Sequence, residues 1–396
     1  ALTAGSQRAA ALGAMAGRLM AQTERILDAN RADLDQAMDE GMPAAMLDRL
    51  ALNPARVADM ARGLEEAAEL PDPVGETLWE AQRPNGLVIR RVSVPLGVIA
   101  VIYEARPNVT ADAAGLCLRA GNACILRGGR EAIRTNLAVA AALRQALKDA
   151  GLDEDGVQLG EDTSRQSADA LMRLDGYVDV LIPRGGQGLI RRAVAYATVP
   201  VIKTGEGVCH IYVDRRADVA MAAGIVHNAK TSRPAVCNAC ECLLVHRDIA
   251  PAALPVIAEK LLKSGVVIKG DAASRGIVPG ISEAGEEDWG REFLGLTIAC
   301  RVVKDLDEAL SHIDRYGTGH SEAIVTEDIA VARAFLSQVD AAAVYHNAST
   351  RFTDGGEFGF GAEIGISTQK LHARGPLGIR ALTGYKYIIT GNGQTR

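Results

Sequence analysis

Three cysteines lie within six positions in the stretch RPAVCNACEC, residues 233–242. One chemistry that this spacing allows is metal binding. Cys237 and Cys240 form a C-x-x-C pair, and Cys242 and His246 could complete the four ligands that a structural zinc ion needs. Against a zinc site, the chain has no second C-x-x-C pair, and Cys242 and His246 fall in or near a predicted strand, where cysteines often serve as small core residues.

The second chemistry is nucleophilic catalysis, which needs only one thiol in an irregular loop near positive charge. Lys230 and Arg233 lie just upstream of Cys237. Cations at this distance favour the thiolate, which is the reactive form of cysteine. From these residues alone, both the zinc site and the nucleophile stay open.

A polar break follows the apolar run VIAVIY in the segment YEARPNVTADA, residues 103–113. It contains Arg106 and Asn108. An asparagine at the end of a buried strand could donate an amide N–H to a developing oxyanion. An ordinary asparagine in a turn after Pro107 is the alternative.

Two glycine-bearing loops follow strand patterns and precede helical ones, at RGGR and PRGGQG. Backbone N–H groups at a helix N-terminus favour phosphate, and arginines there could pair with the 2′-phosphate of NADP. Neither loop has the G-x-G-x-x-G or G-x-x-x-x-G-K pattern, so simple strand-to-helix turns remain an alternative. The candidate cofactor residues are Arg127, Gly128, Gly129, Arg130, Pro183, Arg184, Gly185 and Gly186.

The elements that position these residues alternate between strand and helix, which predicts parallel sheets flanked by helices. A helical lead-in is expected over residues 6–70, and two strands over 86–104. After the strand that ends at Leu126 comes a helix with Ile133, Leu137, Ala140, Leu143 and Leu147 on one face. A second α/β region begins near Gly205, after two short strands predicted within 199–214, and the chain closes with the β-rich segment GYKYIIT.

Composition limits the classes of function. A length of 396 residues suffices for two or three domains, and a net charge of −6 gives no basic surface for nucleic acid. No apolar run approaches the roughly 20 residues of a membrane span, and the N-terminal stretch lacks the apolar core of a signal peptide. We therefore expect a cytoplasmic protein with reduced thiols and no nucleic-acid or membrane partner.

Three long segments in this order resemble one family: VPLGVIAVIYEARPNVTADAAGLCLRAGNACILRGG, NAKTSRPAVCNACE and YGTGHSEAIVTED. The chain resembles the γ-glutamyl phosphate reductases, a branch of the aldehyde dehydrogenase superfamily. The resemblance implies an α/β fold of the aldehyde dehydrogenase type, with two Rossmann-like domains and a β-ribbon oligomerisation element.

By position, the resemblance makes Cys237 the catalytic nucleophile and Asn108 the oxyanion-hole donor, and leaves no metal site. It assigns the two glycine loops to the cofactor NADPH, together with Glu292 and Phe293 at the nicotinamide ribose. For a substrate that carries a phosphate and an α-carboxylate, the candidates are Arg106, Arg233, Ser349 and Arg351.

The implied reaction is the NADPH-dependent reduction of L-glutamyl 5-phosphate to L-glutamate 5-semialdehyde through a Cys237 thioester, the second step of proline biosynthesis. The implied domains are an NADP-binding domain at 1–204, with the ribbon at 80–96 inserted, a catalytic domain at 205–372, and a C-terminal return and oligomerisation tail at 373–396. A homo-oligomer is expected, with glutamate 5-kinase as the enzyme that could hand over the substrate.

One departure concerns water activation. Hydrolytic aldehyde dehydrogenases resemble E-L-G-G-K where this chain reads KTGEG, residues 203–207, which puts Lys203 at the position of their general-base glutamate. A one-residue gap would bring Glu206 there instead. A hydrolytic aldehyde dehydrogenase is therefore one alternative function, and a zinc-binding protein without enzymatic activity is another.

Overall fold

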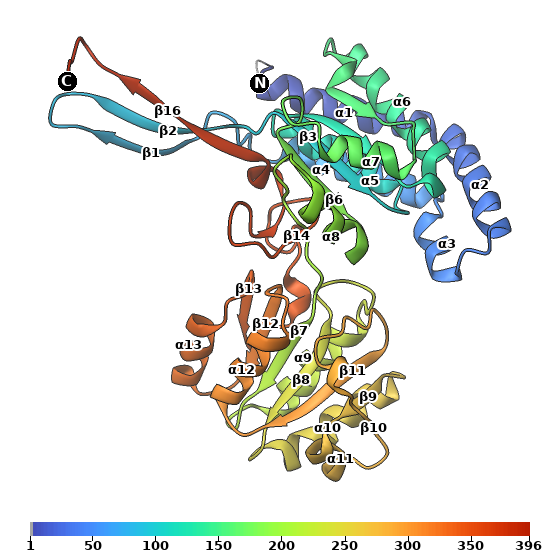
Figure 1. The fold of residues 1–396 in the computed structure, drawn as a ribbon, viewed down its shortest axis with the longest axis vertical. Coiled ribbons are helices and arrows are strands. Elements are labelled where there is room, and N and C mark those ends of the chain that lie inside the picture. The colour runs from blue at the N-terminus through green and yellow to red at the C-terminus, as the bar shows by residue number, and fades with distance from the viewer. Residues whose placement is uncertain (1–2) are drawn as a thin grey trace. The chain divides into compact units, whose positions relative to one another are not determined.

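The computed structural model describes residues 3–396, except for the side chain of Ala45. The chain forms two compact units (Figure 1). The first comprises 1–204, 359–365 and 376–396, and the second comprises 205–358 and 366–375. Among the helices described, none is long and apolar enough to cross a membrane.

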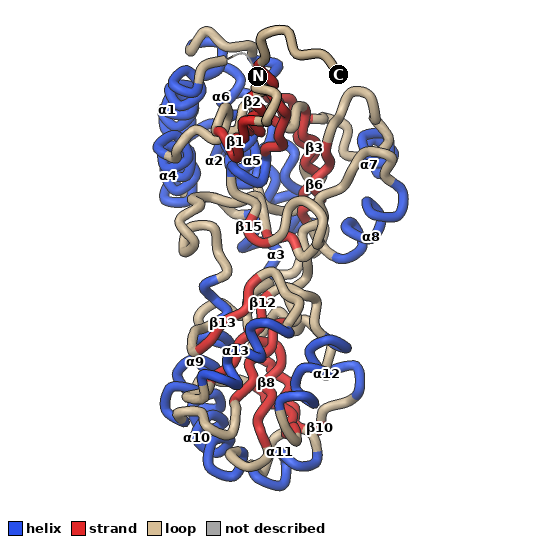
Figure 2. Tube along the Cα trace, turned by 90° about the vertical axis from the view of Figure 1, so that its left-hand side faces the viewer, coloured by secondary structure: helices blue, strands red, loops and turns tan. Residues whose placement is uncertain are grey.

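The first unit begins with the expected helical region, as α1 (Gly5–Ala21), α2 (Thr23–Asp39), α3 (Ala44–Leu50) and α4 (Pro54–Glu69). Local chemistry sets the start of α4, because the Asn53 side chain accepts a hydrogen bond from Arg56 N–H at 2.8 Å and Pro54 occupies the first turn. Helices α1 and α4 run side by side (Figure 2) and bury a stripe of Leu, Met and Ala.

The sheet of the first unit has four parallel strands in the order β5-β4-β3-β6. Helices α7 and α8 pack on one face of it, around Leu181. The bounds are β3 (Val98–Tyr103), α5 (Asn108–Arg119), β4 (Ala123–Arg127), α6 (Ile133–Asp149), β5 (Val157–Leu159), α7 (Arg165–Met172), β6 (Val180–Arg184) and α8 (Gln187–Tyr196), with 3₁₀ turns at Arg130–Ala132 and Glu154–Gly156.

The predicted apolar face of α6 is partly wrong. Leu143 and Leu147 are fully buried, whereas Leu137 is 36% exposed. Ala138 and Val139 are buried instead, because α6 packs against α1 and α2 as well as against the sheet, and so its buried stripe is wider and turned from the one that the spacing suggested.

The second unit contains a seven-stranded parallel sheet in the order β10-β9-β11-β8-β7-β12-β13. Helices α9, α10 and α11 cover one face, and α12 and α13 the other. The bounds are β7 (Cys209–Val213), α9 (Val219–Thr231), β8 (Cys240–His246), α10 (Ala250–Lys263), β9 (Val267–Gly270), α11 (Ala272–Ile277), β10 (Ser282–Glu283), β11 (Thr297–Val303), α12 (Leu306–Tyr316), β12 (Ser321–Val325), α13 (Ile329–Gln338) and β13 (Ala343–His346), with 3₁₀ turns at Glu286–Asp288 and Thr350–Phe352.

The segment 199–214 differs from its prediction of two strands. Only β7 is a strand, and Val201 forms an isolated bridge with Leu181 in the first unit. The chain passes from the first unit to the second after Thr204, so the two predicted strands belong to different units and do not pair.

The C-terminal part is divided more finely than the expected boundary at 372. Residues 364 and 365 exchange backbone hydrogen bonds with Leu377, and Asn122 donates to the Leu382 carbonyl, which ties both segments to the first unit. Lys370 and Arg374 instead form ion pairs with Asp340 in the second unit. Three strands and one 3₁₀ turn complete this part: β14 (Ile366–Ser367), β15 (Gly375–Pro376), the turn Ile379–Leu382 and β16 (Thr383–Thr390).

A separate antiparallel ribbon extends from the first unit in the order β1-β2-β16. It is built from β1 (Thr77–Gln82), β2 (Val88–Pro95) and the C-terminal strand β16. A turn with Gly86 at φ 89° joins β1 to β2. The segment expected as a ribbon at 80–96 therefore pairs with the tail after residue 383, as Figure 1 shows.

Candidate active site

Cys237 lies in the loop between α9 and β8, at the amino end of the strands in the second unit's parallel sheet. It is partly exposed, whereas the other six cysteines are buried and none of the seven forms a disulfide; all seven lie in the described part of the chain. Burial raises the pKa of the Cys240 thiol to about 12, and raises that of the Cys242 thiol well above its ordinary value. Of this cluster, only Cys237 can meet a substrate.

The zinc ligand set considered from the sequence does not converge. Among the residues that the structure describes, the group of three ligand atoms that come within 4.8 Å of one another belongs to His210, Cys242 and His312. Arg301 donates to Nδ1 of His312 at 3.2 Å, so the neutral ring carries its proton on Nε2, which faces Cys242 Sγ at 3.5 Å. A hydrogen bond thus accounts for the contact of Cys242 with His312 in this buried cluster, in which burial lowers the pKa of His312 to about 3.

The segment after Thr204 packs tightly against the Cys237 loop. A Cβ on Gly207 would lie 1.3 Å from the carbonyl oxygen of Cys237, so only glycine fits there. The same carbonyl accepts a hydrogen bond from Cys209 Sγ at 3.2 Å. On its other side, the Gly207 N–H donates to Glu292 Oε1 at 3.1 Å. Gly207 therefore fixes the loop of Cys237 beside Glu292.

Two arginines surround the Cys237 loop with positive charge. Burial lowers the pKa of the Arg351 guanidinium, and the positive charge of Arg233 lowers it further. The Cys237 thiol raises the same pKa, so Arg351 lies close enough to both residues to interact with them electrostatically. The Arg351 guanidinium contacts the side-chain oxygen of Asn238 and donates to Ser232 Oγ at 3.2 Å. Since Asn238 follows Cys237 directly, this contact holds a cation next to the thiol.

Ser349 has a local role in the structure. Its hydroxyl accepts a hydrogen bond from the Arg351 N–H at 3.3 Å and caps the 3₁₀ turn Thr350–Phe352. Thr350 in turn donates to the Asn238 carbonyl at 2.7 Å. The turn thereby fastens Arg351 to the residue after Cys237.

The two residues expected at the nicotinamide ribose lie in a cationic environment in the second unit. The Phe293 ring has Arg291, Lys230 and Lys269 within 5.6 to 5.9 Å of its centre. Burial raises the pKa of the Glu292 carboxyl. The hydrogen bond from the Gly207 N–H lowers this pKa, and the negative charge of Glu206 raises it further. Glu206 is thus close enough to influence the site electrostatically, while Lys203 belongs to the first unit.

The expectation that Lys230 faces the thiol is wrong. Lys230 is fully buried, and its ammonium donates to Glu241 Oε2 at 2.5 Å. The last turn of α9 points this side chain at the first residues of β8, where the sheet and the helix cover it completely. Its charge is therefore compensated within the core, and the cations beside the loop are the exposed Arg233 and the half-buried Arg351.

Arg106 and Asn108 lie in the first unit, between β3 and α5. The preceding Ala105 has a φ of 30°, a strained value for a residue with a side chain, and its N–H donates to Glu131 Oε1 at 2.6 Å. Asn108 begins α5 and is exposed. Its amide Nδ2 donates to Asp112 Oδ2 at 2.9 Å.

The glycine loops of the first unit approach carboxylates closely. Gly186 caps the N-terminus of α8, and its N–H donates to Glu104 Oε2 at 2.9 Å. A Cβ on Gly185 would lie 2.5 Å from the same oxygen. An anionic group is thus held at the N-terminus of α8, as helix polarity and glycine geometry favour.

The arginines at these loops differ in their contacts. Arg127 donates to the carbonyls of Thr163 and Ser164 and is half-buried, and Arg130 forms an exposed ion pair with Glu40 at 2.8 Å. The guanidinium of Arg184 lies against Gly365. The Nε atoms of Arg127 and Arg184 are buried and have no hydrogen-bond partner among the described residues, which leaves donors for a bound group.

Sequence reasoning missed the residues that support the candidates. Asn238 lies inside the quoted RP-x-V-C-N motif, Glu104 and Asp112 lie inside YEARPNVTADA, and Glu131 directly follows RGGR, but none of the four received a role. The signal was present, since each is a polar residue within four positions of a candidate. Their partners are 26 or more positions away for all but Asp112, so spacing alone could not reveal them.

Comparisons with known proteins agree with this geometry. The family model described as "Aldehyde dehydrogenase family" matches residues 3–288. The γ-glutamyl phosphate reductase of Clostridium beijerinckii is 58% identical over 390 residues, covering 98% of this chain and 94% of the relative, and that of Carboxydothermus hydrogenoformans is 57% identical with the same coverage.

Solved structures show the same relationship. The crystal structure of γ-glutamyl phosphate reductase from Thermotoga maritima superposes with a TM-score of 0.98 at 49% identity, and the match covers 100% of this chain and 95% of that one. The fold expected from the sequence, an α/β fold of the aldehyde dehydrogenase type, is confirmed. The chain belongs to the aldehyde dehydrogenase family, within its γ-glutamyl phosphate reductase branch.

Proposed function

We propose that this enzyme reduces L-glutamyl 5-phosphate to L-glutamate 5-semialdehyde and phosphate with NADPH, the second step of proline biosynthesis. The observation that carries the proposal is Cys237, the one partly exposed cysteine of seven, in a loop that holds Arg233 and that Arg351 contacts from the turn Thr350–Phe352. The relatives that cover nearly the whole chain bear the name of this reductase.

The reaction requires a nucleophile and an oxyanion hole. The Cys237 thiolate attacks the acyl carbon and forms a C–S bond, while the carbonyl electrons move to oxygen. When the carbonyl re-forms, the bond between the acyl carbon and the phosphate oxygen breaks. Phosphate leaves with that electron pair, and a thioester remains. We assign the Asn108 amide and the Cys237 backbone N–H to the oxyanion. After reduction of the thioester, the oxyanion collapses, the C–S bond breaks and Cys237 returns to its thiolate form.

Arginines would bind the two anionic ends of the substrate. Arg233 lies on the nucleophile loop and Arg351 on the turn that contacts this loop, where bidentate hydrogen bonds to a phosphate or carboxylate can form. Arg106 would add a cation from the strained turn before α5. Ser349 would act through Arg351, because its hydroxyl caps the turn that carries this arginine.

Enzymes of this family use nicotinamide cofactors, and the residues present fit one. The N-terminus of α8 already holds a carboxylate, and the buried Nε atoms of Arg127 and Arg184 have no partner among the described residues. We propose that NADPH is preferred, with Arg127 and Arg130 as the cations for its 2′-phosphate. When bound, NADPH supplies the hydride. Glu292 and Phe293 would hold its nicotinamide ribose.

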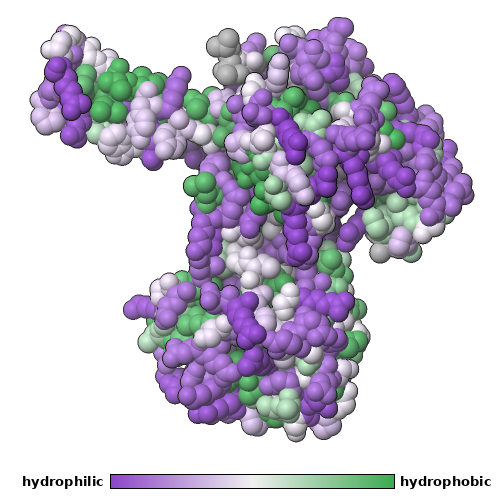
Figure 3. Space-filling model, viewed as in Figure 1, coloured by the Kyte–Doolittle hydropathy of each residue, from purple (hydrophilic) through white to green (hydrophobic). Residues whose placement is uncertain are grey.

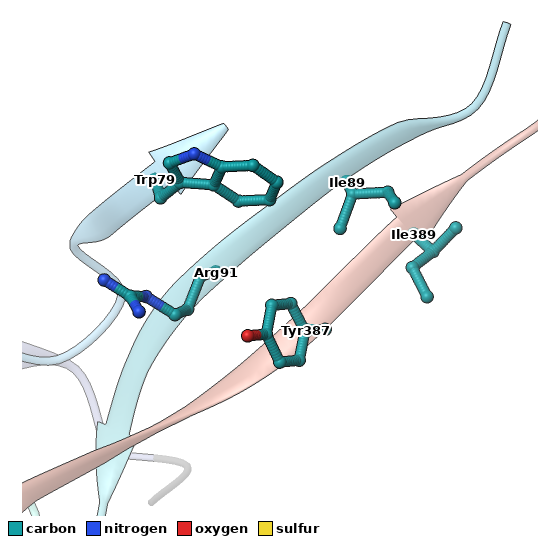
Figure 4. A pocket seen from close by; sticks show the side chains of 5 residues that line it. All are labelled: Trp79, Ile89, Arg91, Tyr387 and Ile389. Carbon is teal, nitrogen blue, oxygen red and sulfur yellow. The ribbon is translucent and has the colours of Figure 1, made fainter. Parts of the chain in front are cut away.

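We also propose that the enzyme is a homo-oligomer whose subunits pair through the ribbon. Trp79, Ile89, Arg91, Tyr387 and Ile389 line a hollow on its surface (Figure 4). Apolar side chains gather along this arm in Figure 3, and Tyr387 and Ile389 are 55% and 60% exposed. A sheet face of this kind is typical of an interface.

The proposed setting is the cytoplasm, where seven cysteines outside disulfides would stay reduced. Glutamate 5-kinase, whose product is the unstable acyl phosphate, is the partner that would hand over the substrate. The proposal does not depend on a direct complex with that enzyme.

The reverse reaction tests the proposal. Purified enzyme should reduce NADP continuously when both glutamate 5-semialdehyde and phosphate are present. Omitting either one should stop sustained turnover. Continuous NADP reduction with semialdehyde alone would instead identify the hydrolytic activity, for which Glu206, close to Glu292, is the structural candidate.

A further inference from the structure

We propose that Asp112 is a positioning residue, whose carboxylate orients the amide of Asn108 so that one of its N–H groups faces the oxyanion. The inference rests on the proposed role of Asn108. It concerns α5 of the first unit, where Asn108 is the first residue and Asp112 follows one turn later on the same face.

The contact between the two side chains is direct. Asn108 Nδ2 donates to Asp112 Oδ2 at 2.9 Å, and the amide of Asn108 makes no other side-chain hydrogen bond within the described part of the chain. An asparagine amide can rotate by 180° and exchange its oxygen for its nitrogen. A rotated Asn108 would present an acceptor to the oxyanion, and such a group would repel the negative charge that it should stabilise.

An ionised carboxylate selects one of these two orientations. It can only accept hydrogen bonds, so it binds the NH₂ group of Asn108 and not the carbonyl oxygen. The second N–H on the same nitrogen then points away from Asp112 and remains available to a ligand. Asn108 thereby becomes a donor with a fixed direction, which is what preorganised stabilisation of a charge requires.

The surroundings of Asp112 suit this role. Burial raises its pKa to about 6, and the hydrogen bond from Asn108 and the charge of Arg184 oppose that shift. Arg184, at the end of β6, is therefore the cation that compensates the carboxylate and limits its repulsion of an oxyanion. Gly63 of α4 lies next to Asp112 without crowding it, because a Cβ added to Gly63 would still lie 3.8 Å from Asp112 Oδ1.

An amide–carboxylate pair one turn apart would also form for purely local reasons, because such pairs stabilise helices. The chain contains a matched example on α6, where Gln145 Nε2 donates to Asp149 Oδ1 at 2.9 Å. That pair lies outside the proposed site. Asp149→Asn is therefore a control for the loss of a helical pair without a positioning function.

The test compares Asp112→Asn, Asn108→Ala, their double variant and Asp149→Asn, each checked for native unfolding behaviour. We expect Asp112→Asn to lower kcat roughly tenfold, because a misdirected catalytic group costs up to about 10²-fold, and to leave the dissociation constant for NADP unchanged. Asp149→Asn should keep full activity. The double variant should be no slower than Asn108→Ala alone, since two residues that act as a unit are not additive.

The pH dependence gives a readout that a structural role would not produce. As the pH falls through about 6, Asp112 binds a proton, can donate to the Asn108 carbonyl oxygen, and no longer selects one orientation. The ratio of wild-type activity to Asp112→Asn activity should therefore fall towards one below pH 6. If Asn108→Ala loses more than 100-fold while Asp112→Asn stays within twofold, Asp112 does not position Asn108. If Asn108→Ala itself loses less than fivefold, the proposed oxyanion role fails instead.

Discussion

At the scale of single residues, exposure separates the nucleophile from its neighbours. Cys237, Cys240 and Cys242 have the same side chain within six positions, yet only Cys237 is reachable, and burial raises the thiol pKa of the other two. A buried thiol with a raised pKa is inert as a nucleophile at neutral pH. The tertiary environment thus leaves only one of these three cysteines exposed enough for the proposed nucleophilic role.

We predict that Cys237→Ser abolishes turnover, whereas Cys240→Ser and Cys242→Ser retain most of it. A serine hydroxyl at residue 237 cannot ionise at neutral pH, while the other two thiols touch no substrate. Steady-state assays on folded variants check this. A folded Cys240→Ser protein as inactive as Cys237→Ser would contradict the assignment, and stoichiometric zinc in the isolated wild type would revive the metal alternative.

Asn108→Ala should lower the rate by about 10² to 10³, the usual loss when one oxyanion donor is removed. Cofactor binding should change little, because Asn108 lies on α5 and not on the glycine loops. Rapid-mixing kinetics, with NADP affinity measured separately, give both quantities. Comparable losses in affinity and in rate would indicate that Asn108 supports the fold or the cofactor.

At the scale of elements, the end of α9 and the start of β8 are joined by a buried ion pair. Lys230 and Glu241 are both within 1% of complete burial, and their side chains meet at 2.5 Å. Burial is the largest influence on Glu241 and raises its pKa to about 7, although Lys230 opposes the shift. The pair spans the nucleophile loop, which begins after Thr231 and ends at Cys240.

Lys230→Met should destabilise the protein by about 3–5 kcal/mol near neutral pH, because it leaves a buried carboxylate without its partner. Glu241 must then stay protonated in the folded state, while the unfolded chain ionises above its ordinary pKa of 4.5. Because the wild-type Glu241 is itself protonated below about pH 7, the loss relative to the wild type should grow as the pH rises above about 7, where only the wild type can ionise Glu241 beside Lys230. Urea unfolding at several pH values measures it.

The control for this pair is Lys230→Met combined with Glu241→Leu. Replacing both charges by apolar groups should recover much of the stability that the single variant loses, since no unpaired charge stays buried. A double variant as unstable as Lys230→Met would show that packing, and not charge, accounts for the loss.

The ribbon gives a prediction for another element. Ile389→Asp should weaken self-association about 10- to 100-fold, because an apolar side chain that contributes about 1.5–3 kcal/mol on burial is replaced by a charge. Lys386→Asp is the control, since successive strand residues point to opposite faces and Lys386 lies on the other face from Tyr387 and Ile389. Light scattering across a dilution series measures both. Equal effects would place the interface elsewhere.

At the scale of the whole molecule, the product of the reverse reaction depends on whether water or phosphate attacks the thioester. A thioester is stable to water that no base activates, whereas a phosphate bound by Arg233 or Arg351 is already positioned. In the reverse reaction without phosphate, we predict at most one equivalent of NADPH per active site. Phosphate, or arsenate in its place, should restore turnover.

This experiment requires phosphate-free buffer and separate measurement of glutamate. Steady formation of NADPH with equal formation of glutamate would show that a base, with Glu206 as the first candidate, activates water. Glu206→Gln would then suppress that activity. Under the proposed function, the same variant should keep phosphate-dependent turnover, because phosphate needs no such base.

The sequence by itself determined the family, the fold and the succession of strands and helices. Long ordered motifs such as the one at residues 94–129 specify an aldehyde dehydrogenase fold, and the alternation of apolar runs with glycine turns specifies parallel α/β units. These properties are local in the chain, because a strand or a helix start depends on residues a few positions apart. The helical region over residues 6–70 and the strands β2, β3 and β16 are predicted from such patterns.

Only the tertiary structure decided which polar groups meet. It directs Lys230 into the core against Glu241 and away from the thiol, joins Arg351 to Asn238 across 113 positions, and holds Glu104 at the N-terminus of α8. It also returns residues 359–365 to the first unit. The physical reason is that burial and pairing depend on what packs around a side chain in space. A pattern of residue types along the chain states which groups are present, but not which of them are covered.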